Sequence, residues 1–267
     1  MNCLFLNNDE QQLKLIKNII KEFQLPLSLS IIDTLDCSNK SLKKLNTLNP
    51  DTPLLFFDKQ SLILAMVVDD EIIKTSLNWQ SLQKRIVSAG KNNELILKAS
   101  KLNKEMSVID GTAGFGQDSL ILASTGASVL MIEQNPMLFL MLVFEQQKMS
   151  QNQNWQKLMT RMSIVFGDSN EIIKQNPKHD LIYLDPMFPN DSYKGAVNKN
   201  MQVLHHFINP PSFADEMVLF ETAMANCDKL MIKRPISAPN FANKSPNQSF
   251  NNDVIRFDVY YPKISNP

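Results

Sequence analysis

The chain has 267 residues, which is enough for one large α/β domain and a smaller partner domain. Lys+Arg and Asp+Glu number 27 each, so the formal charge is zero, which argues against a protein that holds nucleic acid through a global positive field; any RNA contact must come from a local patch. Three dispersed cysteines, no signal-peptide pattern and apolar runs well below about 18 residues favour a reduced cytoplasmic protein without disulfides, structural zinc or a membrane span.

Residues 1–73 are predicted to form a small α+β domain. Met1–Leu6 is a strand candidate, and Asp9 and Glu10 precede the apolar spacing of an amphipathic helix that ends before Pro26. Further strands are expected at Leu27–Ile32, Leu54–Phe57 and Leu62–Val68. This part of the chain carries no motif that indicates chemistry.

Residues 74–105 are predicted to be a basic helical linker. Lys and Arg far outnumber the single acid, Glu94, between residues 74 and 104. Ser76 could cap a helix that holds Trp79, and a second helix is expected at Asn93–Leu102. Two interpretations stay open: a solvated linker, or a face that contacts RNA phosphates, with Arg85 as a candidate.

From residue 106 to 267 the chain alternates strands and helices, which predicts a mostly parallel sheet covered on both faces. Ligands of such Rossmann-like folds bind beyond the carboxyl ends of the strands. An antiparallel edge strand is expected at Val254–Tyr261, after a loop at Ala238–Asn252. The predicted strands are Ser107–Ile109, Ser128–Ile132, Met162–Phe166, Leu181–Leu184 and Lys229–Lys233, and the helices are Gln117–Ser124, Met137–Met149, Asn170–Gln175 and Ala214–Ala225.

A glycine turn follows the first strand of this region. Gly114 and Gly116 would let the backbone approach a ligand and aim amide groups at it. Ser119 stands where a dinucleotide fingerprint has its third glycine, which disfavours NAD or FAD. With Asp110, the pattern D-x-x-x-G-x-G resembles the first motif of class I methyltransferases, which bind S-adenosylmethionine; a plain structural turn is the alternative.

Acidic residues end the next two strands. Glu133 stands about where a Rossmann-like fold places an acid against ribose hydroxyls. Asp168 ends the third strand, and in the families this chain resembles an acid there accepts a hydrogen bond from the adenine amino group. Ser169 could contribute to the site or cap the next helix.

Asp185-Pro186-Met187-Phe188 is the most specific motif. Exocyclic amines of nucleobases are poor nucleophiles, so an enzyme that methylates one must hold the nitrogen in line with the methyl donor. A carboxylate and a turn carbonyl can accept its hydrogen bonds, and an aromatic ring can stack on the base. The motif resembles the (Asp/Asn)-Pro-Pro-aromatic signature of methyltransferases that act on exocyclic amines, with Met187 in place of the second proline.

Over residues 75–262 the chain resembles the bacterial small-subunit ribosomal RNA guanine-N2 methyltransferases of the RsmJ type. The matching segments are Asp110–Asp118, Glu133–Pro136, Tyr183–Pro189, Lys194–Val203, Lys233–Pro235, and the loop from Ala238-Pro239 to Pro246-Asn247. The family has Arg where Gln117 and Gln134 stand, a small residue and Ser at Asp168-Ser169, and more glycines in the segment Lys84–Lys91.

The resemblance implies transfer of a methyl group from S-adenosylmethionine to N2 of a guanosine near the 3′ end of 16S rRNA in the small ribosomal subunit. It places Gln117, Asp118, Glu133, Gln134, Asp168, Ser169 and Asp185 in the cofactor pocket, beside Asp110, Gly114 and Gly116. Asp185 and Pro186 would orient the amine, and Phe188 would stack on the guanine. Candidate phosphate contacts are Lys194, Lys199, Lys233 and Arg234.

Two other functions stay open. One is a methyltransferase for another exocyclic amine, of DNA or RNA adenine or of a protein amide. The other is a non-catalytic RNA-binding or ribosome assembly protein that keeps the methyltransferase fold. The spacing of the three histidines matches no zinc site, so no metal is expected. The sequence does not indicate the oligomeric state.

Overall fold

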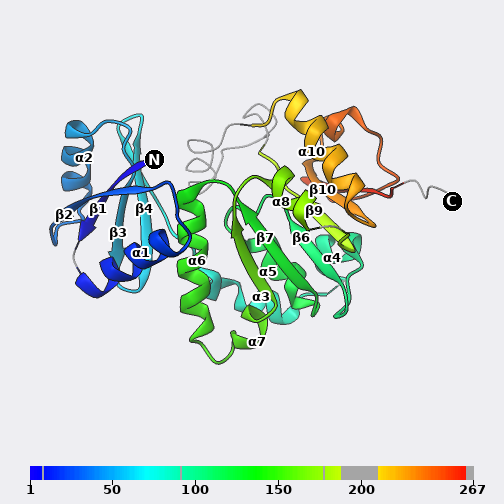
Figure 1. Ribbon diagram of the computed structural model, residues 1–267, viewed down its shortest axis with the longest axis horizontal. Coiled ribbons are helices and arrows are strands. Elements are labelled where there is room, and N and C mark those ends of the chain that lie inside the picture. The colour runs from blue at the N-terminus through cyan, green and yellow to red at the C-terminus, as the bar shows by residue number, and fades with distance from the viewer. Residues whose placement is uncertain (8, 91, 177, 188–209, 263–267) are drawn as a thin grey trace.

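The computed structural model describes residues 1–262 apart from residues 8, 91, 177 and 188–209, and contains two β-sheets with helices packed around them (Figure 1). The predicted aromatic contact Phe188 and the predicted phosphate contacts Lys194 and Lys199 lie outside the described residues. In the part that is described, no helix has the length and apolar character needed to cross a membrane.

The first sheet is built from the N-terminal part of the chain, in the order β2-β1-β3-β4-β5. Its strands are β1 (Asn2–Asn7), β2 (Ser28–Asp33), β3 (Leu54–Asp58), β4 (Ser61–Val68) and β5 (Glu71–Thr75). β1 runs parallel to β2 and β3, and the other neighbours are antiparallel. Helix α1 (Glu10–Glu22) begins where the Asp9 carboxylate accepts hydrogen bonds from two backbone amides, as its acidic start predicts. The small α+β fold is confirmed, although α2 (Asn39–Leu48) and β5 were not predicted.

The segment between the two sheets, predicted to be a basic helical linker, is helical but contributes side chains to the hydrophobic core. It contains the 3₁₀ helix η1 (Trp79–Leu82) and the short helices α3 (Gln83–Ser88) and α4 (Leu95–Ser100). Trp79 is only 1% exposed and belongs to the main hydrophobic core. Asn78 rather than Ser76 caps η1. How the chain divides into domains stays a prediction, but this segment packs against helices and strands of the part of the chain that follows it.

The second sheet has seven strands in the order β11-β12-β10-β9-β6-β7-β8. They are β6 (Ser107–Asp110), β7 (Ser128–Glu133), β8 (Met162–Phe166), β9 (Leu181–Leu184), β10 (Leu230–Pro235), β11 (Gln248–Asn251) and β12 (Ile255–Tyr260). β10, β9, β6, β7 and β8 are parallel, whereas β12 is antiparallel to both β10 and β11. The mostly parallel sheet with an antiparallel C-terminal strand confirms the predicted Rossmann-like fold.

Helices cover both faces of the second sheet because its central strands are apolar on both sides. In β6, for example, Val108 belongs to one hydrophobic cluster and Ile109 to the other. One face carries α5 (Gln117–Ser124), α6 (Pro136–Ser150) and α7 (Gln156–Met159), and the other carries α8 (Ser169–Gln175), α10 (Phe213–Ala225) and the 3₁₀ helix η3 (Phe241–Asn243) (Figure 1).

Helix α6 also joins the second sheet to the N-terminal part of the chain (Figure 1). Phe139 packs edge-to-face with Phe23 of the N-terminal part, with ring centroids 5.0 Å apart. Phe144 packs in the same way against Phe57 of β3, at 5.3 Å. Since one hydrophobic core runs through both sheets, the two parts of the chain are held together by buried aromatic contacts.

The strand predicted at Val254–Tyr261 is present and antiparallel, but its predicted position at the edge of the sheet was wrong. β12 lies inside the sheet, and β11 forms the edge. β11 comes from the stretch predicted to be the loop Ala238–Asn252. Its sequence, Gln-Ser-Phe-Asn, is short and polar, so it lacks the apolar alternation that identifies a strand from sequence.

Candidate active site

Polar side chains gather where the parallel strands of the second sheet end. Asp110 ends β6 and Glu133 ends β7, Asp168 follows β8 after one intervening residue, and Asp185 comes directly after β9. Lys233 lies in the second half of β10. Because parallel strands end at the same edge of a sheet, residues far apart in sequence meet there, and this edge is where such folds bind ligands.

The glycine turn between β6 and α5 has two residues in the left-handed region, Gly114 with φ 53° and Gly116 with φ 70°. Gly116 is the N-cap of α5, and no side chain caps the helix there. Asp110 accepts hydrogen bonds from the Ser119 hydroxyl at 2.5 Å and the Thr112 amide at 3.1 Å. Burial raises the pKa of Asp110 to about 7. The first turn of α5 therefore presents amides without a side-chain cap beside a buried carboxyl group.

Glu133 ties the glycine turn to β7. Its Oε2 accepts a hydrogen bond from the Gly114 amide at 3.0 Å, and its Oε1 accepts one from the Asn135 amide at 2.7 Å. The side chain is buried, and burial raises its pKa to about 7 against the opposing effect of these amides. The neighbouring Gln134 is exposed. Glu133 thus lies against the glycine turn, and its predicted role in a ligand pocket stays a prediction.

Asp168 and Ser169 divide two tasks that sequence alone left open. Asp168 is exposed and caps α8, since its carboxylate accepts hydrogen bonds from the amides of Asn170 and Glu171 at 2.9 and 3.2 Å. Ser169 does not cap the helix; its hydroxyl donates to the carbonyl of Gly111. Ser169 therefore attaches the start of α8 to the glycine turn.

Asp185 lies directly against the same turn. Its backbone amide donates a hydrogen bond to Oγ1 of Thr112 at 2.6 Å. Its carboxylate Oδ2 lies 2.8 Å from Nζ of Lys233, and the same Nζ lies 2.9 Å from Oδ2 of Asp118. The Tyr183 hydroxyl donates to that Asp118 oxygen at 2.6 Å. We call these four side chains, Asp118, Tyr183, Asp185 and Lys233, the acid–lysine cluster.

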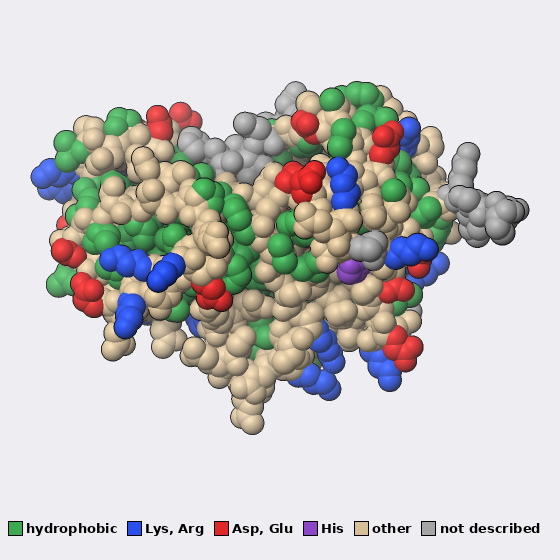
Figure 2. Space-filling model, viewed as in Figure 1, with side chains coloured by type: hydrophobic (Ala, Val, Ile, Leu, Met, Phe, Trp, Pro, Cys, Tyr) green, Lys and Arg blue, Asp and Glu red, His purple; other side chains and the backbone are tan. Residues whose placement is uncertain are grey.

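The other predicted site residues have different surroundings. Pro186 is buried directly after Asp185, and Gln117 is exposed at the start of α5. Arg85 makes two hydrogen bonds to the carboxylate of Glu94, at 2.6 and 2.8 Å. Arg234 is 3% exposed and donates to the carbonyl of Pro239, so its guanidinium is a structural group rather than a surface cation. On the face drawn in Figure 2 basic and acidic side chains are interspersed, as the zero net charge suggests.

Sequence reasoning missed three residues that shape the site. Thr112 holds Asp185, Tyr183 holds Asp118, and Trp79 donates its indole N–H to the carbonyl of Phe115 at 2.9 Å. Thr112 lies in the glycine-turn motif and Tyr183 lies just before Asp185. Their polar groups near strand ends could have identified both as candidate site residues. No sequence pattern could have identified Trp79, because its contact with Phe115 forms only when the fold brings these distant residues together.

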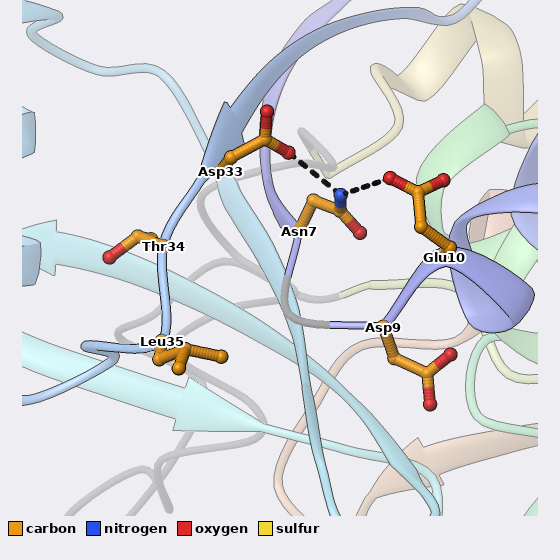
Figure 3. Close-up of a pocket in the computed structure, with 6 residues that line it drawn as sticks. All are labelled: Asn7, Asp9, Glu10, Asp33, Thr34 and Leu35. Carbon is orange, nitrogen blue, oxygen red and sulfur yellow. Dashed lines mark hydrogen bonds between the residues drawn. The ribbon is translucent and has the colours of Figure 1, made fainter.

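A hollow lies in the N-terminal part of the chain, at the ends of β1 and β2 (Figure 3). It is a pocket of about 450 Å³ lined by Asn7, Asp9, Glu10, Asp33, Thr34 and Leu35. Asn7 donates to Glu10 and Asp33 at 3.0 and 2.7 Å. Over the residues that the structure covers, no group of three or more His, Cys, Asp or Glu side chains could hold a metal ion.

Comparison with known proteins gives a consistent result. A family model described as "Putative SAM-dependent methyltransferase" matches residues 40–262. A curated protein named ribosomal RNA small subunit methyltransferase J, from Psychrobacter cryohalolentis, is 38% identical over 97% of this chain and 94% of its own length. The protein of the same name from Acinetobacter baylyi is 32% identical over 71% of this chain and 74% of its own.

Among solved structures, a SAM-dependent methyltransferase from Neisseria gonorrhoeae superimposes on the chain with a TM-score of 0.71. The alignment covers 100% of this chain and 98% of the other, at 24% identity. At that identity the match supports the fold, and it extends over both sheets.

Proposed function

The chain belongs to the family of S-adenosylmethionine-dependent methyltransferases that contains the ribosomal RNA small subunit methyltransferases J, and we propose that it methylates N2 of a guanosine near the 3′ end of 16S rRNA. S-adenosylmethionine is its methyl donor, and when bound it supplies an electrophilic methyl group on a sulfonium. The substrate is the small ribosomal subunit or its RNA, in the cytoplasm.

The residues at the strand ends fit the donor. A Cβ atom at Gly114 would meet only a backbone oxygen, at 3.8 Å, so the turn has open space on that side. We propose that the backbone from Gly114 to Gly116 lies against the methionine part, with Asp110, Gln117 and Asp118 around it. Glu133, with Gln134, would hold the ribose hydroxyls, and Asp168 and Ser169 would lie near the adenine.

Asp185 is proposed to orient the acceptor amine. Among the described residues, the hydrogen bonds of its carboxylate involve Oδ2, which leaves Oδ1 to accept an N–H bond from the guanine. The amine lone pair is delocalised into the ring, so the rate depends on holding the nitrogen in line with the methyl group. No strong base is needed, because the nitrogen becomes acidic once it is alkylated. The prediction that Phe188 stacks on the base lies outside the described residues.

The observation that carries the proposal is the 2.6 Å hydrogen bond from the Asp185 amide to Thr112. It joins the motif expected to orient the acceptor to the turn expected to bind the donor. A methyl group moves only when donor and acceptor lie within about 3–3.5 Å, so the two sites must adjoin.

The donor assignment is tested by calorimetry with S-adenosylmethionine and its demethylated product on the wild-type protein and on Asp185→Ala. The wild type should bind both, and the variant should bind the donor but transfer its methyl group at least about 100-fold more slowly. A wild-type protein that binds neither compound would refute the pocket.

The substrate is tested with tritiated donor, small subunits and naked 16S rRNA, followed by digestion of the product to nucleosides. N2-methylguanosine is expected. A methylated adenine or a methylated protein amide would favour the other exocyclic-amine reaction, and donor binding without any turnover would favour a non-catalytic assembly protein.

A further inference from the structure

Lys233 is enclosed by acids in a way that its predicted contact with RNA phosphates does not explain. Its Nζ lies 2.9 Å from Asp118 on α5 and 2.8 Å from Asp185 after β9. The Lys233 side chain is 24% exposed, Asp118 is 21% exposed and Asp185 is 31% exposed. Binding a phosphate at Nζ would mean loosening two ion pairs that are largely shielded from water.

We propose that Lys233 is a positioning residue for methyl transfer, which fixes the Asp185 carboxylate through Oδ2 so that Oδ1 faces the acceptor amine. The inference rests on the proposed role of Asp185. An ammonium group has three N–H donors, and two of them suffice to hold Asp118 and Asp185 together. The pairing restricts rotation of the Asp185 side chain, which is the freedom that would misplace the amine.

Besides holding the Asp185 carboxylate in place, Lys233 also affects the pKa of that carboxyl group. The titratable groups that face Asp185 from the described elements are Asp110 of β6, Asp118 of α5, Tyr183 of β9 and Lys233 of β10. Burial raises the pKa of Asp185, Lys233 opposes this, and Asp118 adds to it. Lys233 is therefore the neighbouring group that favours the ionised, hydrogen-bond-accepting form of Asp185 beside a second carboxylate.

The same ion pairs shift the pKa values of Asp118 and of Lys233 itself. Burial works against ionisation of Asp118, but Lys233 and the Tyr183 hydroxyl lower its pKa overall. Burial likewise works against the charged form of Lys233, but the two carboxylates raise its pKa overall. One cation thus stabilises two anions at the boundary between the proposed donor and acceptor sites.

The test compares Lys233→Met, which keeps the length but removes the charge, with Lys233→Arg, which keeps the charge. Single-turnover methylation of small subunits is measured from pH 5 to 9 at saturating donor. For Lys233→Met we expect a rate about 100-fold lower, an RNA KM within about threefold of wild type, and an acid limb moved to higher pH. Lys233→Arg should recover most of the rate and the wild-type limb.

Lys98→Met is the matched control, since Lys98 is an exposed lysine in α4, within the predicted basic helical linker. It should leave the maximal rate and the acid limb unchanged. If Lys233→Met raised the RNA KM and kept the wild-type rate and pH profile, Lys233 would be a phosphate contact and the proposal would fail. A loss confined to donor affinity would also overturn it, because Lys233 would then act through Asp118.

A measurement without substrate separates this inference from the proposed function. Carboxyl ¹³C NMR, with the Asp185 signal assigned from Asp185→Asn, should show Asp185 titrating at higher pH in Lys233→Met than in wild type. Equal titration would refute the electrostatic role even in an active enzyme. A shifted titration in a protein that methylates no small subunit would instead refute only the substrate.

Discussion

Trp79 donates its indole N–H to the carbonyl of Phe115, 2.9 Å away, and this hydrogen bond holds the backbone of the glycine turn in place. Its backbone amide is held in turn by the carboxylate of Glu145 on α6, at 3.2 Å. A Cβ atom on Gly116 would lie 2.9 Å from the Trp79 ring. The segment before the second sheet is thus part of the support of the turn, and the turn depends on a residue outside its own motif.

Replacing Trp79 should weaken both the fold and donor binding. Trp79→Phe leaves the Phe115 carbonyl without its donor and opens space under the turn. We expect the free energy of unfolding to fall by about 2 kcal/mol and the Kd for the demethylated donor product to rise several-fold. Chemical denaturation and calorimetry measure the two effects.

Trp155→Phe is the matched control, because Trp155 is equally buried but its indole N–H has no hydrogen-bond partner in the described structure. It should lose less stability and no donor affinity. With Trp79 as the sole tryptophan, this variant should also change fluorescence when the product binds. Equal losses in both variants would show that Trp79 matters only as core volume.

Changing each glycine of the turn to alanine should have a different effect: Gly116→Ala should mainly lower stability, and Gly114→Ala should mainly weaken donor binding. At Gly116 the new Cβ would lie 2.9 Å from Trp79 and 3.1 Å from Leu142, at a φ of 70°, so Gly116→Ala should lose about 2–4 kcal/mol of stability. At Gly114 the space is open, so Gly114→Ala should lose only about 1–2 kcal/mol while weakening donor binding at least about tenfold.

Gly90→Ala controls for loss of a glycine as such, because its nearest neighbour would be 3.7 Å away and its φ is not in the left-handed region. Thermal unfolding and calorimetry on the three variants check this prediction. If Gly114→Ala bound the donor as wild type does, the proposed approach of the backbone to the donor would be wrong.

The main sheet could be predicted because its parallel strands contain short apolar runs with a polar residue at the end of the run or shortly after it. β8 and β9 and helix α5 have the predicted bounds, and the strand ends identified Asp110, Glu133 and Asp185 as neighbours. What was missed has weak local patterns: α2 is polar, α7 has four residues, and β11 has one large apolar side chain. Neighbouring strands, more than their own sequences, stabilise such elements.

Partners across the fold could not be predicted either. Lys233 and Arg234 are adjacent in one motif and were expected to contact phosphates together. Since successive side chains of a strand point to opposite faces, Lys233 meets Asp118 and Asp185 while Arg234 meets Glu216 and Pro239. A positive charge in a sequence indicates a need for a counter-charge, but not which one.

Donor binding should release a proton at Glu133. The pKa of this buried carboxyl is about 7 in the folded protein, and ribose hydroxyls donate to its ionised form. The affinity should therefore rise by up to about tenfold per pH unit below pH 7 and level off above it. Calorimetry in buffers of different ionisation enthalpy measures the protons released.

Glu133→Gln supplies the comparison for that measurement, and it also tests the sign of the effect on stability. Because the pKa of Glu133 in the folded protein lies above 4.5, the ordinary value for a glutamate, the folded state keeps a proton that the unfolded state loses. The Glu133 contribution to stability therefore falls as pH rises from about 4.5 to 7. The variant should lack this fall and release fewer protons on binding. Identical proton release in both proteins would place the titration elsewhere.

Arg234 should matter for stability and not for RNA. Its guanidinium donates to the Pro239 carbonyl at 3.0 and 2.8 Å and pairs with Glu216 at 3.4 Å, beneath the chain that leads to η3. Arg234→Met would remove these buried hydrogen bonds, leaving the Pro239 carbonyl with a 3.4 Å bond from Arg256 and Glu216 with the bond from the Ala242 amide, so we expect about 2–4 kcal/mol less stability. At a temperature where the variant is folded, its RNA KM should be that of the wild type. A raised KM with unchanged stability would restore the predicted phosphate contact.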